Sequence, residues 1–370
     1  MTQLADPTTL VLWGGFAIGF VFGAVAHKTN FCTMGAISDV VNMGHWGRIR
    51  MWLLAVAVAV IGSNLLFVSG QIDLAKSVYL RPTLPWLSLL LGGTLFGIGM
   101  TLTGGCVNKN LIRLGGGSAR SLVVLTFTAI AAYMTLKGLF GQWRATWLDP
   151  VNIDLAGIGM SDQSLASLVA KASGLPAHHA TVAAALVLGG AMLVFAVADR
   201  RFRSNAVQLI GAFTLGAMVV AAWYLTGHLG YGENPETLET VFFATNTRTL
   251  ESISFVAPTA YSLELLMLWT DKSLRPTFGI VTVLGLVAGS LAYALASRRF
   301  TWEGFASFGD LRNHLIGAVL MGFGGVTAMG CTVGQGMSGL STLAIGSLLA
   351  VAGIVTGAVA TMKYMLWREG

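Results

Sequence analysis

The feature that most constrains this chain is a run without any charged residue or histidine, which extends from Leu315 to Met362. A transmembrane helix needs about 20 mostly apolar residues, so this run is long enough to cross a bilayer twice. In its middle lies the polar, glycine-rich segment "TAMGCTVGQGMSGLS" at 327–341. Irregular backbone at membrane depth is tolerated only where it is buried in protein or lines a cavity. The run therefore predicts a membrane protein with a break inside the bilayer.

The composition extends this interpretation to the whole chain. A soluble domain has about 25% charged residues, whereas this chain has 10%, with 55% hydrophobic residues and a mean hydropathy of +0.73. The net charge of +6 is spread over predicted inter-helix loops, which indicates membrane topology rather than nucleic-acid binding. Because residues 1–9 contain no basic residue, we expect the first apolar segment to be retained rather than cleaved as a signal peptide. These properties predict an all-α integral membrane protein.

Nine segments have the length and hydropathy of a transmembrane helix. They are 9–27, 51–69, 85–104, 121–140, 180–198, 206–226, 277–296, 311–330 and 341–362. Basic residues follow every odd span, whereas loop 227–276, after an even span, holds six acidic and three basic residues. The positive-inside rule then places the N-terminus outside and the C-terminus in the cytoplasm. Apolar patches in loop 141–179 could form a helix on the membrane surface.

An internal repeat relates the two halves of the chain. The segments "LGGTLFGIGMTLTGGC" (91–106) and "IGAVLMGFGGVTAMGC" (316–331) are identical at six of sixteen positions, with a constant offset of 225. The same offset carries spans two to four onto spans seven to nine, and five intervening spans predict opposite orientations in the membrane. We expect a first repeat at 1–140, a connecting loop and extra helix at 141–205, and a second, inverted repeat at 206–370. Convergent glycine composition is the alternative explanation.

The three cysteines, Cys32, Cys106 and Cys331, each stand beside glycines and polar residues at a break in an apolar span. An odd number of cysteines without any CxxC pair does not indicate a disulfide framework or a zinc site. Polar side chains at membrane depth often mark a transport pathway. The predicted pathway residues, besides the cysteines, are Asn30, Thr33, Gly105, Asn108, Lys109, Gly330, Thr332 and Gln335. A counterpart of Cys32 in the second half would fall near Ala257, where no cysteine exists.

Thiols in a pathway suit a soft anion. An S–H group is a weak donor on a polarizable atom, and the ends of broken helices offer N–H groups and a positive dipole end. Such contacts favour binding and still allow release. The alternatives are that each cysteine is only a small buried apolar residue, that Lys109 is an ordinary positive-inside charge, and that a thiolate relays sulfane sulfur as a persulfide.

Other function classes lack their motifs. The chain has no GxxxxGK[ST] phosphate loop and no HExxH motif, and we identify no Ser/His/Asp set, so the sequence predicts neither an enzyme nor a bound cofactor or metal. His178 and His179 are expected to be solvated. The pairs Gly15/Gly19, Gly19/Gly23, Gly93/Gly97 and Gly285/Gly289 have GxxxG spacing and are expected to mediate helix packing. A structural membrane subunit remains the third class beside a transporter and a relay.

Three motifs give the chain a resemblance to a known family. "TNFCTMGAISD" (29–39), "GGCVNKNLIRLGGGS" (104–118) and "GCTVGQGMSGLSTLAIGS" (330–347) resemble the cysteine motifs of YeeE/YedE-type sulfur transporters, from about residue 10 to the C-terminus. The resemblance implies a nine-helix bacterial inner-membrane protein with inverted repeats, with thiosulfate passing Cys32, Cys106 and Cys331. It also implies a small TusA-like sulfurtransferase as cytoplasmic partner. The residues "VNKNLIR" are more basic than in better-known members, so sulfite, a selenium oxyanion or another sulfur species remains an alternative substrate.

Overall fold

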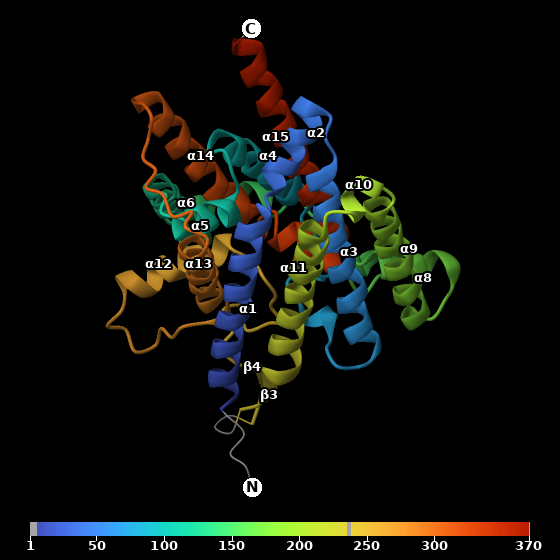
Figure 1. Cartoon of the computed structure of the whole chain (residues 1–370). Coiled ribbons are helices and arrows are strands. Elements are labelled where there is room, and N and C mark those ends of the chain that lie inside the picture. Colours follow the sequence, from blue (N-terminus) through green and yellow to red (C-terminus); the bar gives the residue numbers. More distant parts are fainter. Residues whose placement is uncertain (1–5, 235–237, 370) are drawn as a thin grey trace.

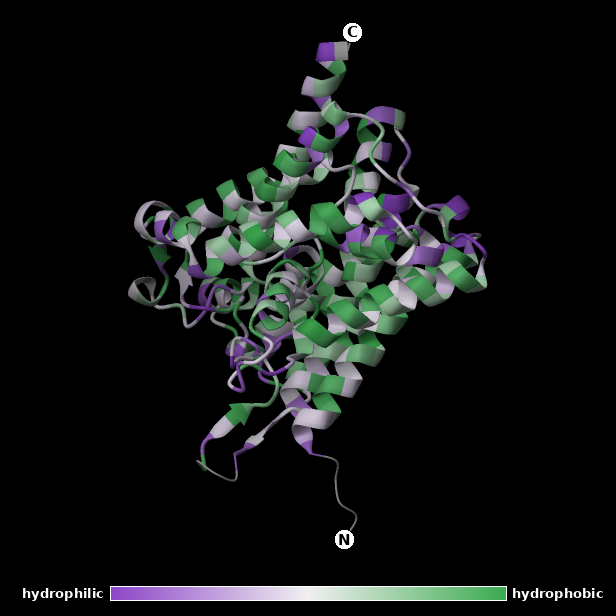
Figure 2. Ribbon diagram, turned by 90° about the vertical axis from the view of Figure 1, so that its left-hand side faces the viewer, coloured by the Kyte–Doolittle hydropathy of each residue, from purple (hydrophilic) through white to green (hydrophobic). Residues whose placement is uncertain are grey.

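The computed structural model describes residues 6–234 and 238–369, and it is built almost entirely from helices. The long helices of the described residues coincide with the predicted spans. They are α1 (Pro7–Thr29), α3 (Gly47–Val68), α4 (Trp86–Leu102), α6 (Ala119–Lys137), α9 (Ala177–Val197), α11 (Ala206–Tyr224), α13 (Phe278–Ala296), α14 (Phe308–Thr327) and α15 (Ile345–Glu369). Hydrophobic residues cover most of their length, and hydrophilic residues gather in loops and at helix ends (Figure 2). The chain is an all-α integral membrane protein.

Eight of these helices are long and apolar enough to cross a membrane, within the described part of the chain. The ninth, α14, carries Asp310, Arg312 and His314 in its first turns, which lowers its hydropathy. Helix α1 begins on the face that carries the β3–β4 hairpin, and α15 ends on the opposite face, beside α2 (Figure 1). An odd number of crossings is needed to bring the chain from one face to the other. The count of nine stays a prediction, which this arrangement favours.

Short elements connect the long helices. Four of them accompany the breaks in the apolar spans: α2 (Thr33–Met43), α5 (Val107–Gly115), α12 (Val256–Met267) and the π-helical η5 (Gly334–Gly339). The others are η1 (Leu74–Lys76), α7 (Leu139–Trp143), η2 (Arg144–Leu148), η3 (Ala156–Ile158), α8 (Leu165–Ser173), α10 (Arg200–Arg203) and η4 (Leu225–Leu229). Helix α12 lies within 227–276, where the sequence predicts a loop, because its 12 residues are too few for a span.

The strands form two small antiparallel pairs. Strand β1 (Thr83–Leu84) pairs with β2 (Ile153–Asp154), with Thr83 opposite Asp154. Strand β3 (Tyr231–Glu233) pairs with β4 (Thr240–Phe242), with Tyr231 opposite Phe242. The first pair ties the connecting segment after α7 to the start of α4, and the second closes a hairpin after η4. Both pairs lie outside the long helices, so the sheet content does not alter the helical architecture.

Helix packing follows a pattern that occurs twice. Helix α1 packs on α13 as α11 packs on α3, and α4 packs on α15 as α14 packs on α6. In the same way α2 contacts α3 and α15, while α12 contacts α13 and α6. The second contact of each comparison has the same form as the first. The helices that correspond are α1 and α11, α2 and α12, α3 and α13, α4 and α14, and α6 and α15. The contacts α4–α14 and α1–α11 join the two sets. Helix α9 packs on α3 outside this pattern.

Glycines allow these helices to approach until backbones touch. A Cβ atom on Gly19 would lie 2.2 Å from the carbonyl oxygen of Thr282, and one on Gly289 would lie 1.9 Å from that of Phe20. A Cβ atom on Gly97 would lie 2.2 Å from the carbonyl oxygen of Ile354. Real Cβ atoms do not come this close to oxygen, so the predicted packing role of the GxxxG pairs is confirmed.

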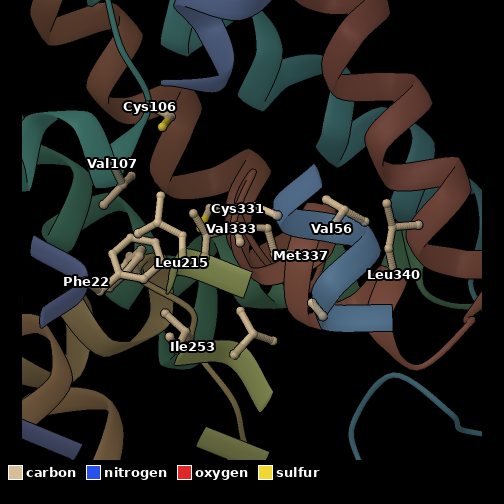
Figure 3. Close-up of a cluster of buried hydrophobic side chains, with 14 of the residues drawn as sticks. Phe22, Val56, Cys106, Val107, Leu215, Ile253, Cys331, Val333, Met337 and Leu340 are labelled. Atoms are coloured by element: carbon tan, nitrogen blue, oxygen red, sulfur yellow. The ribbon is translucent and has the colours of Figure 1, made fainter. Parts of the chain in front are cut away.

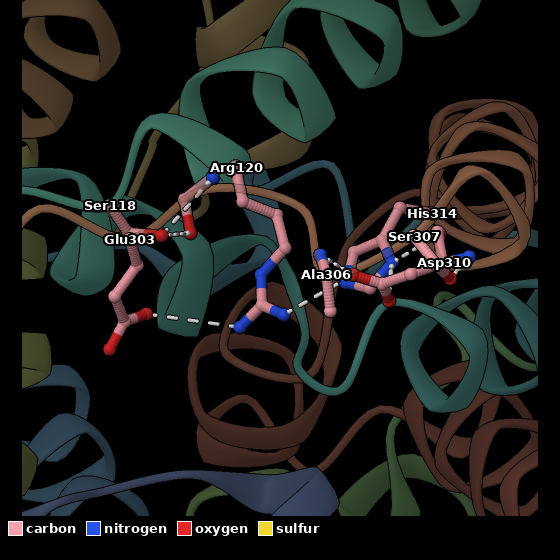
Figure 4. A network of polar contacts seen from close by, with 8 residues as sticks. Ser118, Arg120, Glu303, Ala306, Ser307, Asp310 and His314 are labelled. Carbon is pink, nitrogen blue, oxygen red and sulfur yellow. Dashed lines mark hydrogen bonds and ion pairs between the residues drawn. The ribbon is translucent and has the colours of Figure 1, made fainter.

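Charged residues fasten the α13–α14 loop to the start of α6 (Figure 4). The Arg120 guanidinium lies 3.8 Å from Glu303 Oε2 and 3.7 Å from Asp310 Oδ2. The Arg120 amide also donates to the carbonyl oxygen of Glu303, and His314 Nδ1 lies 3.0 Å from Asp310 Oδ1. Arg120, Glu303 and Asp310 are partly exposed, so each of the two arginine pairs contributes only about 0–1 kcal/mol.

Replacing Arg120 by methionine should therefore loosen this loop without unfolding the protein. We expect proteolytic cleavage within 298–307 to become up to about fivefold faster, which corresponds to roughly 1 kcal/mol. Arg200→Met, which removes an exposed arginine of α10, serves as control. Equal cleavage rates for Arg120→Met and the wild type would show that the ion pairs do not hold the loop.

Candidate functional site

The three cysteines stand in one recurring backbone arrangement. Two residues before each cysteine, a residue in the left-handed conformation ends the preceding long helix: Asn30 (φ 54°), Gly104 (φ 64°) and Met329 (φ 58°). In each case the amide of the following residue donates to a carbonyl group one turn and a half back in the helix, at 2.8–3.0 Å. This is a Schellman end, which satisfies the last carbonyl groups of the helix and reverses its direction. The breaks at membrane depth are therefore ordered turns.

A new helical element begins directly after Cys32 and Cys106, and three residues after Cys331. Cys32 is the N-cap of α2, and its Sγ accepts from the amide of Gly35 at 3.3 Å. Cys106 is the N-cap of α5. Cys331 Sγ accepts from the amide of Gly334 at 3.4 Å, where η5 begins. Helix N-termini carry unpaired N–H groups and a partial positive charge. All three thiols thus lie where an anion is stabilised.

The second half contains a fourth helix start without a cysteine. Phe255 is the N-cap of α12, and its backbone amide lies near Cys331 Sγ. In the repeat, α12 takes the place of α2, whose N-cap is Cys32. No cysteine stands near Ala257, so this position lacks the thiol. The helix start itself is present.

The three thiols meet in the buried centre of the molecule. Cys106 has both Cys32 and Cys331 as near neighbours, and the exposed fractions of the three are 8% for Cys32, 1% for Cys106 and 0% for Cys331. All three are free cysteines. Apolar side chains, among them Phe22 and Leu215, surround Cys106 and Cys331 (Figure 3). The described residues contain no cluster of His, Cys, Asp or Glu able to hold a metal ion.

Three polar side chains around the thiols are buried without a hydrogen-bond partner. Thr332 Oγ1 lies near the Cys106 thiol, Asn108 Oδ1 lies in the first turn of α5, and Thr327 Oγ1 lies at the end of α14. Each residue is 1% exposed. A buried polar group without a partner is costly and rare, so such groups point to a ligand or to water. Thr332 and Asn108 were predicted from the sequence to lie here.

Other predicted pathway residues shape the breaks themselves. Gln335 Nε2 donates to the carbonyl oxygen of Ala328 at 2.5 Å, and its Oε1 accepts from Ser347 Oγ at 2.6 Å. This fully engaged amide fixes the turn around Gly330. In the first half, the carbonyl oxygen of Gly105 accepts from Thr103 Oγ1 at 2.9 Å and from Asn110 Nδ2 at 3.0 Å. These contacts make Gln335, Gly330 and Gly105 supports of the break.

A basic side chain of α5 contacts the break between α1 and α2. Lys109 Nζ, on the first turn of α5, donates to Asn30 Oδ1. The same lysine is a close neighbour of both Cys32 and Cys106. Thr33, the first residue of α2, is 9% exposed and shares a small apolar cavity with Thr332. Every predicted pathway residue therefore lies at one of the three breaks, and Asn30 and Lys109 are brought together across them.

A cavity of about 400 Å³ opens beside the Cys331 break, and it is called the outer cavity because its loops follow spans predicted to end outside. Thr327, Met329 and Gly330 line it together with Arg81 and Arg144. Arg144 Nε lies 3.1 Å from Asp149 Oδ2, whereas Arg81 is exposed. These arginines are not among the pathway residues predicted from the sequence. The signal available was their position after predicted even spans, where the positive-inside rule does not expect basic residues.

A second cavity of about 110 Å³ adjoins the first, and its lining residues Tyr79 and Ser254 lie against Gly334, three residues after Cys331. The two share Thr247, Ser254, Tyr261 and Met329, and the second is also lined by Tyr79 and Glu251. Burial raises the pKa of the Tyr79 hydroxyl, and the nearby Cys331 and Glu251 add to this shift. Burial also raises the pKa of the Glu251 carboxyl, against the opposing effect of hydrogen bonds from residues 246 and 247.

Comparisons with known proteins agree on one family. The family described as "Sulphur transport" matches residues 28–360. The chain is similar to the thiosulfate transporter TsuA of Escherichia coli (strain K12), with 25% identity over 346 residues that cover 88% of this chain and 87% of that protein. It is also similar to the thiosulfate transporter TsuA of Spirochaeta thermophila, with 23% identity over 370 residues, 97% of this chain and 100% of that protein.

Proposed function

This chain belongs to the sulphur transport family, and from that membership and the geometry of the three breaks we propose that it is a permease that imports thiosulfate. The observation that carries the proposal is the meeting of three free thiols, each at the start of a helical element, in the centre of a multi-pass membrane protein. Two similar proteins are named thiosulfate transporters. Transport, rather than catalysis, is the activity that this site supports.

The path that we propose begins in the outer cavity and passes the thiols in the order Cys331, Cys106, Cys32. Arginines at the cavity attract the anion, and Thr327 offers it a hydroxyl group that has no other partner. Between Cys331 and Cys106, Thr332 Oγ1 supplies a second such hydroxyl. A thiol binds a soft anion weakly, so successive sites can hand it on without trapping it.

Asn108, Lys109, Asn30 and Thr33 follow on the inner side in this proposal. The Lys109 ammonium, held by Asn30, would attract the anion as it leaves Cys106. Gly105, Gly330 and Gln335 keep the breaks in the shape that the path needs. Their role is to position the thiols, and the cysteines and hydroxyl groups contact the substrate.

We propose the bacterial inner membrane as the location, with the N-terminus outside and the C-terminus in the cytoplasm. The opposite faces on which α1 begins and α15 ends support termini on opposite sides of the membrane (Figure 1), and the basic residues after the odd spans support the cytoplasmic side for the C-terminus. The recurring helix contacts support a first repeat at 1–140, a connecting segment with the extra helix α9 at 141–205, and an inverted repeat at 206–370. A small TusA-like sulfurtransferase that receives the cargo at the cytoplasmic face completes the proposal.

Uptake of labelled thiosulfate into liposomes that contain only the purified protein tests this function. The expected result is uptake above that of empty liposomes. No uptake would favour a structural subunit, and a sulfur adduct on a cysteine, found by intact-mass spectrometry after exposure to substrate, would favour a persulfide relay. Competition by sulfite and selenite decides between thiosulfate and another sulfur or selenium species.

Lys109→Met should slow this uptake. Loss of a cation beside Cys32 and Cys106 removes attraction for the anion, and we expect a roughly fivefold lower rate, which corresponds to about 1 kcal/mol. The matched control is Lys363→Met, which removes an exposed lysine near the end of α15. An equal uptake rate in Lys109→Met and Lys363→Met would indicate that Lys109 only helps to set the membrane topology.

A further inference from the structure

A carboxylate occupies an anion-binding turn between the outer cavity and Cys331. Glu251 Oε1 accepts from the backbone amide of Asn246 at 2.9 Å, and from the amide and the hydroxyl of Thr247, both at 2.7 Å. Two successive amides and a hydroxyl that converge on one oxygen form a nest suited to an anion. Glu251 thus fills, with its own side chain, donors that an external oxyanion could also use.

The position of this turn makes it relevant to the path. Thr247 lines both the outer cavity and the smaller cavity behind it, whereas Glu251 lines the smaller one. Tyr79 is a neighbour of both Glu251 and Cys331 and lines the smaller cavity together with Glu251. An anion that enters the smaller cavity from the outer one comes close to the Glu251 carboxylate, and like charges repel.

The segment 246–252 is firmly attached on one side only. Leu250 N donates to Lys76 O at 3.3 Å, Ser252 Oγ donates to Val219 O at 3.1 Å, and the backbone oxygen of Glu251 accepts from Thr226 Oγ1 at 2.5 Å. The turn 246–249 is closed by the Glu251 side chain, and within it Arg248 has the strained φ of 53°. Release of the carboxylate would remove three hydrogen bonds from this turn and leave the contact of Asn246 with Tyr261, while its base stays in place.

The charged and titratable groups around Glu251 are Tyr79, Tyr261 on α12 and, through Tyr79, the thiol of Cys331. None of them is a cation, and Arg248, the cation within the turn, makes no ion pair with Glu251 among the described residues. The arginines lie in the adjoining outer cavity. The hydrogen bonds from Asn246 and Thr247 are therefore what keeps the carboxylate in this place.

We propose that the turn 246–249 is an outer gate over Cys331, which Glu251 latches shut by occupying the donors that an incoming sulfur oxyanion takes when it displaces the carboxylate. The ligand class rests on the proposed function, whereas the latch does not. The oxyanion brings several acceptor oxygens for the amides and the hydroxyl, and displacement moves the repelling carboxylate out of its way. The gate opens only when an anion of this kind arrives.

Access to Cys331 tests the latch without any transport. In a parent variant with Cys32→Ser and Cys106→Ser, Cys331 is the sole thiol, and its reaction with a small anionic methanethiosulfonate can be followed by intact mass in detergent solution. Adding Glu251→Gln should make the reaction about tenfold faster, because a charge-assisted latch is about twice as strong as a neutral one. Glu239→Gln, which changes an exposed glutamate at the β3–β4 hairpin, should leave the rate unchanged.

Thr247→Ala removes one donor and leaves the carboxylate in place, so it provides the same test if Glu251→Gln does not fold; we expect a rate between those of the parent and Glu251→Gln. Equal labelling rates in the parent and in the Glu251→Gln variant would overturn the latch.

Glu251→Gln in the wild-type background should also increase thiosulfate uptake into liposomes. Unchanged uptake together with faster labelling would overturn the displacement step. Absence of uptake by the wild type itself contradicts the proposed function and leaves the labelling result intact.

Discussion

Replacing Cys331 by alanine is expected to reduce thiosulfate uptake by roughly 10- to 100-fold. The Cys331 thiol is fully buried, directly after Gly330 of the outer cavity and near Cys106, so the proposed path runs past it. A hydrogen bond to a charged group contributes about 1.5–3 kcal/mol, which corresponds to this range. The measurement is the initial rate of uptake into liposomes that contain equal amounts of folded protein. Cys106→Ala should have an effect of similar size.

Cys331→Ser is the matched control for the chemistry. Serine keeps a donor at the start of η5 but replaces the polarizable sulfur with a smaller, harder oxygen. If softness matters, the serine variant should also transport thiosulfate poorly, and if any donor suffices, it should approach the wild type. Intact uptake in both Cys106→Ala and Cys331→Ala would refute the thiol path.

The second large effect is on folding. Gly289→Leu should prevent accumulation of folded protein, because even the Cβ atom would lie 1.9 Å from the carbonyl oxygen of Phe20, where α13 packs on α1. The obstacle is backbone, which cannot turn away like a side chain, so we expect a loss of about 3 kcal/mol or more. Detergent extraction followed by size-exclusion chromatography and thermal melting measures the outcome.

Gly190→Leu is the matched control for this substitution. Gly190 also lies within a long helix, α9, but a Cβ atom there meets nothing within 4 Å. The two variants add the same side chain, so a difference between them reports on helix packing rather than on leucine itself. Normal yield and melting temperature for Gly289→Leu would mean that α1 and α13 do not pack as described.

Local sequence patterns predicted much of the architecture. Apolar length located all the long helices, since a bilayer selects about 20 apolar residues wherever the chain crosses it. The repeat around Cys106 and Cys331 located two of the breaks, and the glycine spacing marked helices that pack closely, although only the structure shows that α1 packs on α13. By contrast, α12 was missed because a short helix packed against protein has no such length signal. The roles of Gln335 and Lys109 are also visible only in the structure. Gln335 bonds to Ala328 and Ser347, and Lys109 bonds to Asn30.

The sequence by itself determined that the chain is an all-α membrane protein with polar, cysteine-bearing breaks, because hydropathy and glycine content act over a few neighbouring residues. Only the tertiary structure decided that the breaks meet, with Cys106 between Cys32 and Cys331 and with Glu251 beside the cavity that leads to them. These residues come from segments far apart in the chain, and their distances depend on how closely glycine-bearing helices pack. No local pattern encodes such a distance, since it is the sum of many helix–helix contacts.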